Sequence, residues 1–161
     1  NFWRIAFQRR YSYYPIIPGL TWQQLYRQAN FNYFVQLIDN TDSLLYQATD
    51  HDYALVEGAA IAGRILQRNF PQDNIGVIAY SPNGDQVPLE AIVYDHLIDA
   101  NSRRAQKLIE EDSNLYTVQI GQRKPEYYLF NINQSHLDVI RDILDTTLLG
   151  TLVKIRRVNF F

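Results

Sequence analysis

Chemically reactive side chains are few in this chain, and none stands in a catalytic spacing. His51, His96 and His136 are far apart, so no two of them have the His-x-x-x-His spacing that places two imidazoles on one helix face to bind a metal. The chain has no cysteine, which excludes disulfides, thiolate nucleophiles and thiolate metal ligands. We therefore expect no cofactor and no metal held by a local motif.

Two pairs of carboxylates remain as candidates for catalysis. Asp95 and Asp99 are four residues apart, so one helix turn would bring them together as a general acid and base or as magnesium ligands. We favour a role at a helix start, where acidic groups interact well with the helix dipole. Asp85 and Glu90 resemble the acidic pair of a restriction-type nuclease, but Ile92 stands where that motif needs a lysine. The sequence has no phosphate-binding glycine loop and no serine-hydrolase elbow, so we favour a non-enzymatic function over an enzyme.

Two basic segments are the best candidates for a binding site. The first covers residues 2–14 and combines arginines with aromatic rings, and the second lies close to the C-terminus. Arginine binds phosphates and carboxylates through several hydrogen bonds, and tyrosine and tryptophan provide large contact areas. The candidate binding residues are Trp3, Arg4, Arg9, Arg10, Tyr11, Tyr13, Tyr14, Lys154, Arg156 and Arg157.

Three functions fit these segments. The leading hypothesis is a non-enzymatic interaction or assembly module, which docks a protein partner or a second copy of itself through the N-terminal arm. That arm would pack poorly on its own domain until the partner binds. One alternative is a nucleic-acid-binding protein, or a nuclease whose acidic residues converge only in space. The other is the soluble domain of a membrane-anchored protein that meets a membrane surface, because Asn1 in place of an initiator Met indicates a processed chain or a fragment.

Composition indicates one globular domain with uneven charge. The chain has 161 residues, of which 47% are hydrophobic and 20% charged, and its net charge is −2. Up to residue 38 the only charges are arginines, residues 39–112 are mainly acidic, and residues 151–161 are basic. No apolar run approaches eighteen residues, so no transmembrane helix is expected.

The first part of the chain predicts an arm, a short helix and a strand. Residues 1–19 close on two prolines, Pro15 and Pro18, which favours a basic aromatic arm in an extended conformation. A single α+β domain over residues 20–161 should follow. Thr21 and Gln24 fit a capping box for a helix reaching Ala29. Alternating side chains then predict a strand from Phe31 to Leu37, before a polar, turn-like stretch over residues 39–50.

The rest of the chain predicts two antiparallel β-hairpins that alternate with helices, an αββαββαβ core. The helix over residues 52–70 has a small, uncharged centre, so we expect it to be buried against neighbouring backbone. Asn83-Gly84 is a strong hairpin turn signal. The successive elements after that helix are a hairpin over residues 75–94, a charged helix over 99–111, a hairpin over 115–132, a helix over 135–150 and a strand over 152–161.

The order helix–hairpin–helix–hairpin–helix resembles that of the single-motif homing endonucleases. In that family an acidic residue at the end of the first helix enters the active site beside a metal. Here the corresponding helix ends in Gln67-Arg-Asn-Phe70, which has no acidic residue. The resemblance therefore concerns the order of the elements and does not extend to the activity.

Overall fold

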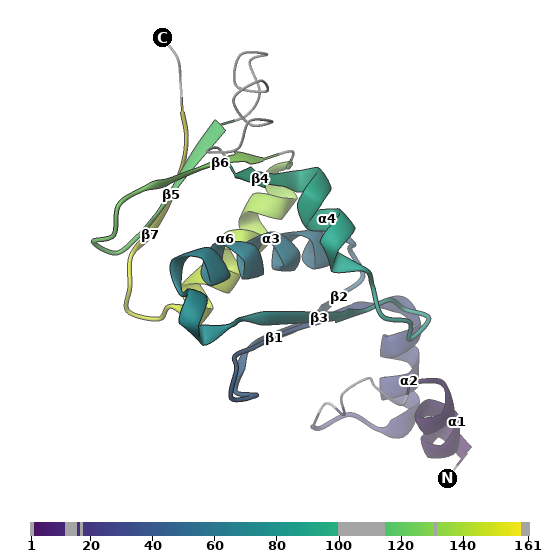
Figure 1. Cartoon of the computed structure of the whole chain (residues 1–161). Helices are drawn as coiled ribbons and strands as arrows, with labels where there is room; N and C mark the ends of the chain where they lie inside the picture. Colours follow the sequence, from purple (N-terminus) through teal and green to yellow (C-terminus); the bar gives the residue numbers. More distant parts are fainter. Residues whose placement is uncertain (1, 12–15, 17, 100–114, 131, 159–161) are drawn as a thin grey trace.

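Helices and sheets alternate in layers: an N-terminal helix pair, a three-stranded sheet, a layer of helices and a four-stranded sheet (Figure 1). This computed structural model describes residues 2–11, 16, 18–99, 115–130 and 132–158. The predicted α+β class is confirmed. The helices are α1 (Phe2–Arg10), α2 (Trp22–Phe31), α3 (Ala54–Asn69), α4 (Leu89–His96) and α6 (Gln134–Thr147), with a 3-10 turn at Pro71–Asp73. The strands are β1 (Tyr33–Ile38), β2 (Leu44–Asp50), β3 (Gly76–Tyr80), β4 (Leu97–Asp99), β5 (Leu115–Ile120), β6 (Glu126–Phe130) and β7 (Val153–Arg157).

Both sheets are antiparallel and pack against the same helical layer. Sheet A has the strand order β2-β1-β3, and sheet B has the order β4-β6-β5-β7. In sheet A, Val35 and Leu37 point towards α3, while Phe34 points to the opposite side. In sheet B, Val118 and its cross-strand neighbour Ile155 point towards the helices. Alternate residues of each strand therefore line one continuous core.

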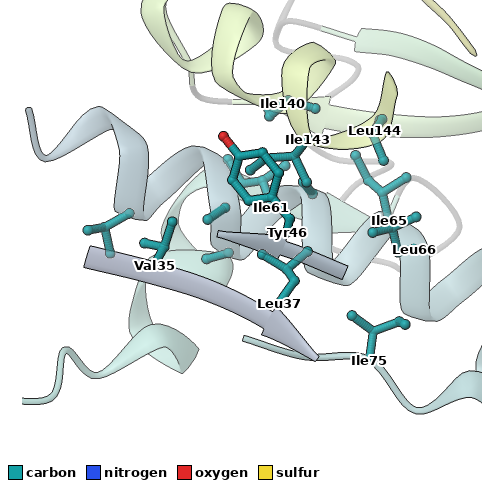
Figure 2. Close-up of a cluster of buried hydrophobic side chains, with 14 of the residues drawn as sticks. Val35, Leu37, Tyr46, Ile61, Ile65, Leu66, Ile75, Ile140, Ile143 and Leu144 are labelled. Carbon is teal, nitrogen blue, oxygen red and sulfur yellow. The ribbon is translucent and has the colours of Figure 1, made fainter. Parts of the chain in front are cut away.

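Helix α3 lies at the centre of that core, as its small, uncharged middle predicts. Most of its residues are buried, and side chains from β1, β2, α3 and α6 meet around it (Figure 2). A Cβ atom on Gly58 would lie 2.6 Å from Val139 Cγ1 of α6, and one on Gly63 would lie 2.3 Å from Val77 Cγ2 of β3. These two glycines let the neighbouring elements approach closely, because nothing larger than hydrogen fits.

The N-terminal segment is helical over Phe2–Arg10, so the expected extended arm is wrong there. Trp3, Phe7 and Tyr11 are spaced four residues apart, which places three rings on one helix face. That face packs on α2, and Phe7 and Tyr11 join Phe34 of β1 in a second, smaller core. Pro18 lies in the segment that follows α1, and Pro15 lies outside the described residues. The expectation that this segment packs poorly on its own domain is also wrong.

The hairpin predicted over residues 75–94 has only its first strand. β3 and the turn at Gly84 are present, with φ of 85° at that glycine. The second arm makes one isolated bridge, from Gln86 to Tyr80, and then Leu89 begins helix α4. Pro88 accounts for this difference, because it has no N–H group for a strand ladder and favours the start of a helix.

β2 occupies the stretch that looked turn-like. Residues 44–50 pair with β1 along their length, with Tyr46 opposite Leu37. The turn before β2 is fixed by Asp39, whose carboxylate accepts hydrogen bonds from the Thr41 hydroxyl and from the amides of Thr41 and Ser43. These bonds hold the pKa of Asp39 below its usual range.

The remaining C-terminal elements follow the predicted order. β5 and β6 form the expected hairpin, and β7 is the expected last strand. Helix α6 begins after Asn133 rather than at Ser135, because the Asn133 side chain accepts a hydrogen bond from the His136 amide. Asp99 is the last residue of β4, and the rest of the charged helix predicted over 99–111 lies outside the described residues.

Candidate functional site

The register of sheet B determines which side chains point away from the helices. Val118 and Ile155 face the core, so the residues that alternate with them face outward. Thr117 lies between Tyr127 of β6 and Arg156 of β7, and Gln119 lies opposite Lys154. We call this surface the outer face of sheet B, which consists of Thr117, Gln119, Tyr127, Lys154 and Arg156.

None of the described helices covers this surface. The helical layer lies on the inner side of sheet B, and α1 and α2 lie at the far end of the molecule (Figure 1). Tyr127 exposes 49% of its surface, and Lys154 and Arg156 are also exposed. Leu115 at the start of β5 has the same orientation but is buried, so the open area begins at Thr117.

Charge separates the two sheets. The described strands and turns of sheet B carry five cations, Arg123, Lys124, Lys154, Arg156 and Arg157, and two acids, Asp99 and Glu126. Glu126 is already within 3.4 Å of Arg68 of α3. Sheet A with its turns carries Asp39, Asp42, Asp50 and Asp73, and no lysine or arginine occurs in residues 33–50 or 71–80. A chain of net charge −2 therefore presents a locally cationic sheet, which attracts polyanions.

The other cations of this sheet differ in role from Lys154 and Arg156. Arg123 donates a hydrogen bond to the Asn69 carbonyl oxygen, and its guanidinium lies 4.2 Å from the centre of the Phe70 ring. This side chain ties the β5–β6 turn to the end of α3. Arg157, which sequence reasoning grouped with Lys154 and Arg156, lies opposite Tyr116 and points to the other side of the strand.

The N-terminal candidates are divided between the interior and the surface. Tyr11 is 1% exposed, and its hydroxyl lies 2.9 Å from Asn30 Oδ1 and 3.1 Å from the Pro82 carbonyl oxygen. Burial raises the pKa of this phenol. Trp3 is half-buried against the Tyr26 ring, with centroids 5.5 Å apart. These rings hold α1 on the domain.

Among the described candidate residues of the N-terminal segment, the three arginines of α1 are the ones exposed on its surface. Arg4 and Arg9 are exposed, and exposed Arg10 reaches the Tyr26 hydroxyl at 3.4 Å. Tyr13 and Tyr14 lie outside the described residues. α1 and β7 are at opposite ends of the molecule, so the two groups of candidate residues do not form one site (Figure 1).

A buried carboxylate–histidine pair was missed by sequence reasoning. Glu57 of α3 contacts His136 Nε2 in the first turn of α6. The other ring nitrogen, Nδ1, accepts a hydrogen bond of 3.1 Å from the Asn133 amide. Both nitrogens are therefore used in joining the starts of two helices, and this arrangement fits a structural role better than proton transfer. His136 was expected near a helix start, but nothing in the sequence pairs it with Glu57.

The acidic residues do not assemble a metal site in the described part of the chain. Asp95 lies near the C-terminal end of α4, so its expected role at a helix start is wrong, whereas the rest of the helix expected to begin at Asp99 lies outside the described residues. Asp85 lies in the turn after β3, and Glu90 is exposed in the first turn of α4. Among the residues described, no three His, Asp or Glu side chains are grouped closely enough to bind a metal ion.

Two further findings concern the remaining alternatives. No helix in the described segments combines the length and the apolar character needed to cross a bilayer. Comparisons with family models, with curated proteins and with solved structures give no match for this chain.

Proposed function

We propose that this chain is a non-enzymatic interaction module that binds single-stranded nucleic acid on the outer face of sheet B. The observation that carries the proposal is the row Tyr127–Thr117–Arg156, where an exposed ring and an exposed cation lie in register across neighbouring strands. Adjacent strands are about 4.8 Å apart, so the backbones of β6 and β7 that carry the ring and the cation are about 10 Å apart, with Thr117 of β5 between them.

Each residue of this row has a chemical role in such a complex. A base would stack on Tyr127, because every base has a flat face that stacks on an aromatic ring. Lys154 and Arg156 would bind the phosphates, and Thr117 and Gln119 would supply hydrogen-bonding groups between them. A duplex offers no unstacked base for Tyr127, which is why the proposal specifies a single strand.

A second candidate is docking of an acidic protein on the outer side of α1. Phe2 exposes 73% of its surface and Ile5 47%, and they accompany the exposed Arg4 and Arg9 on the same short helix. Exposed apolar side chains beside cations are typical of protein interfaces. This candidate keeps the function expected from sequence but confines it to one side of α1.

Fluorescence anisotropy with labelled oligo(dT) and oligo(U), titrated at several salt concentrations, tests the proposal. The Lys154→Gln/Arg156→Gln variant should bind more weakly, and its log–log salt slope should be shallower by about 1.4, since each lost phosphate contact removes about 0.7. Tyr127→Ala should lose about 1–3 kcal/mol of binding free energy.

The matched control is Arg4→Gln/Arg9→Gln, which removes the same charge from α1. It should bind oligonucleotides as the wild type does. The proposal is wrong if neither oligonucleotide binds at low salt, or if the Lys154/Arg156 variant binds like the wild type. If only the α1 variant binds oligonucleotides more weakly, the binding surface is on the N-terminal helix instead.

A further inference from the structure

A pocket of about 640 Å³ opens between α3, β3, α4 and β6, apart from the outer face of sheet B. Its apolar lining comes from Ala60 of α3, Ile75 and Val77 beside and within β3, and Leu89 and Val93 of α4. Tyr128 of β6, which is 1% exposed, also contributes to the lining. A volume of this size, with mainly apolar walls and a few polar groups, is typical of a small-molecule site.

The charged residues of the pocket come from two different helices. Arg64 and Arg68 are one turn apart on α3, and Glu90 stands on α4. Arg68 is already engaged by Glu126 at 3.4 Å and lies 5.7 Å from the centre of the Tyr128 ring. Arg64 and Glu90 are exposed, and neither forms an ion pair or a side-chain hydrogen bond with any other described residue. The pocket therefore offers one cation and one anion, on separate walls, for a ligand to contact.

This charge balance selects the class of ligand. The charge of Arg68 is balanced by Glu126, and the charge of Arg64 equals that of Glu90 with the opposite sign. The pocket is therefore neutral as a whole, but its positive and negative groups are separated. A simple anion would be attracted by Arg64 but repelled by Glu90. A simple cation would be attracted by Glu90 but repelled by Arg64. A zwitterion contacts both groups favourably, with charge-assisted hydrogen bonds at each end.

We infer that this pocket binds an α-amino acid that has a large apolar side chain. The ligand carboxylate would be bound by Arg64, its ammonium group by Glu90, and its side chain by the apolar lining. An aromatic side chain suits the volume better than a small one, because a small side chain would leave much of the apolar lining in contact with water.

Three probes separate the two charged contacts, and isothermal titration calorimetry with the full chain measures their binding. L-tryptophan carries both charges, N-acetyl-L-tryptophan lacks the ammonium group, and L-tryptophanamide lacks the carboxylate. L-tryptophan should bind most tightly. Glu90→Gln should weaken the binding of L-tryptophan and its amide about tenfold, and it should strengthen the binding of the N-acetyl compound, whose carboxylate Glu90 repels. Arg64→Gln should weaken the binding of L-tryptophan and the N-acetyl compound, and it should strengthen the binding of the amide, whose ammonium group Arg64 repels.

Arg27→Gln and Asp145→Asn are matched controls, because they remove exposed charges from α2 and α6 outside the pocket. Both should bind L-tryptophan as the wild type does. Val93→Trp, which places a ring in the pocket from α4, should abolish binding while circular dichroism shows the fold retained. The inference fails if L-tryptophan gives no heat at millimolar concentration, if N-acetyl-L-tryptophan binds more tightly than L-tryptophan, or if Arg64→Gln and Glu90→Gln both bind unchanged.

Discussion

Sheet A and sheet B share one helical core but differ on their outer faces. On sheet A, α1 and α2 cover Phe34, and Gln28 of α2 donates a hydrogen bond of 2.8 Å to the Thr49 hydroxyl. On sheet B, Tyr127, Lys154 and Arg156 are exposed, and no described helix lies over them (Figure 1). The outer face of sheet A is therefore enclosed by two helices, and the exposed outer face of sheet B is the surface that we propose for binding.

The same comparison separates two uses of arginine and aromatic side chains. In α1 the rings of Phe7 and Tyr11 point inward and stabilise the domain. In sheet B the ring of Tyr127 and the guanidinium of Arg156 both point outward. Composition alone predicts an interface in both places, whereas helix periodicity buries the α1 rings Phe7 and Tyr11 and strand register exposes the ring of Tyr127.

The largest expected effect tests whether α1 is a structural cover. Phe7 is 2% exposed within the second core, so Phe7→Ala should lower the free energy of unfolding by about 3–5 kcal/mol. Phe2→Ala, on the same helix, removes a ring that is 73% exposed and should cost less than about 0.5 kcal/mol. Urea denaturation at pH 7 measures both. Equal, small effects would mean that α1 is the loosely attached arm expected from sequence.

The fold could be predicted where local signals were strong. The capping box at Thr21, the small centre of α3 and the alternation of β5 and β6 each indicate their element within a few residues. The prediction failed where distant contacts decide the structure. α1 is helical because its rings pack against α2 and β1. β2 is a strand although its sequence is polar, because its pairing with β1 places Tyr46 opposite Leu37.

The candidate site was only partly predictable for the same reason. Lys154 and Arg156 were identified from their local charge. Tyr127 was not, because the sequence Tyr127-Tyr128 does not say which ring is outward. The register of β6 on β5 exposes the first and buries the second to 1%. A one-residue shift of this strand would exchange them.

A smaller effect tests how firmly the inner face of sheet A is held to α6. The Tyr46 hydroxyl donates a hydrogen bond of 2.8 Å to Asp142 Oδ2, so Tyr46→Phe should cost about 1 to 2 kcal/mol at pH 7. Burial, followed by this carboxylate, raises the pKa of Tyr46 above its ordinary value. The unfolded chain therefore loses its phenol proton first as the pH rises above about 10, and the unfolding free energy falls there.

The pH dependence of the stability difference between the wild type and Tyr46→Phe is the control for this prediction. The stability advantage of the wild type over Tyr46→Phe should be fully present below about pH 10 and should shrink as the pH rises through the pKa of the folded protein. Urea denaturation at pH 7, 9 and 10.5 compares the two proteins, which share all other tyrosines. An advantage that stays constant up to pH 10.5 would show that Tyr46 ionises equally in the folded and unfolded states.

The smallest expected effect compares equivalent threonines on the two outer faces. Thr49 of β2 accepts the hydrogen bond from Gln28, whereas Thr117 of β5 makes no side-chain hydrogen bond with any other described residue. Replacing either by alanine carries a similar cost from lower strand propensity. Thr49→Ala should cost about 0.5–1.5 kcal/mol more than Thr117→Ala, since only the first loses a bond to a covering helix. Gln28→Ala combined with Thr49→Ala isolates the pair in a double-mutant cycle. A coupling energy near zero would mean that the bond from Gln28 does not stabilise sheet A, and a larger effect at Thr117 would contradict the expected difference between the two outer faces.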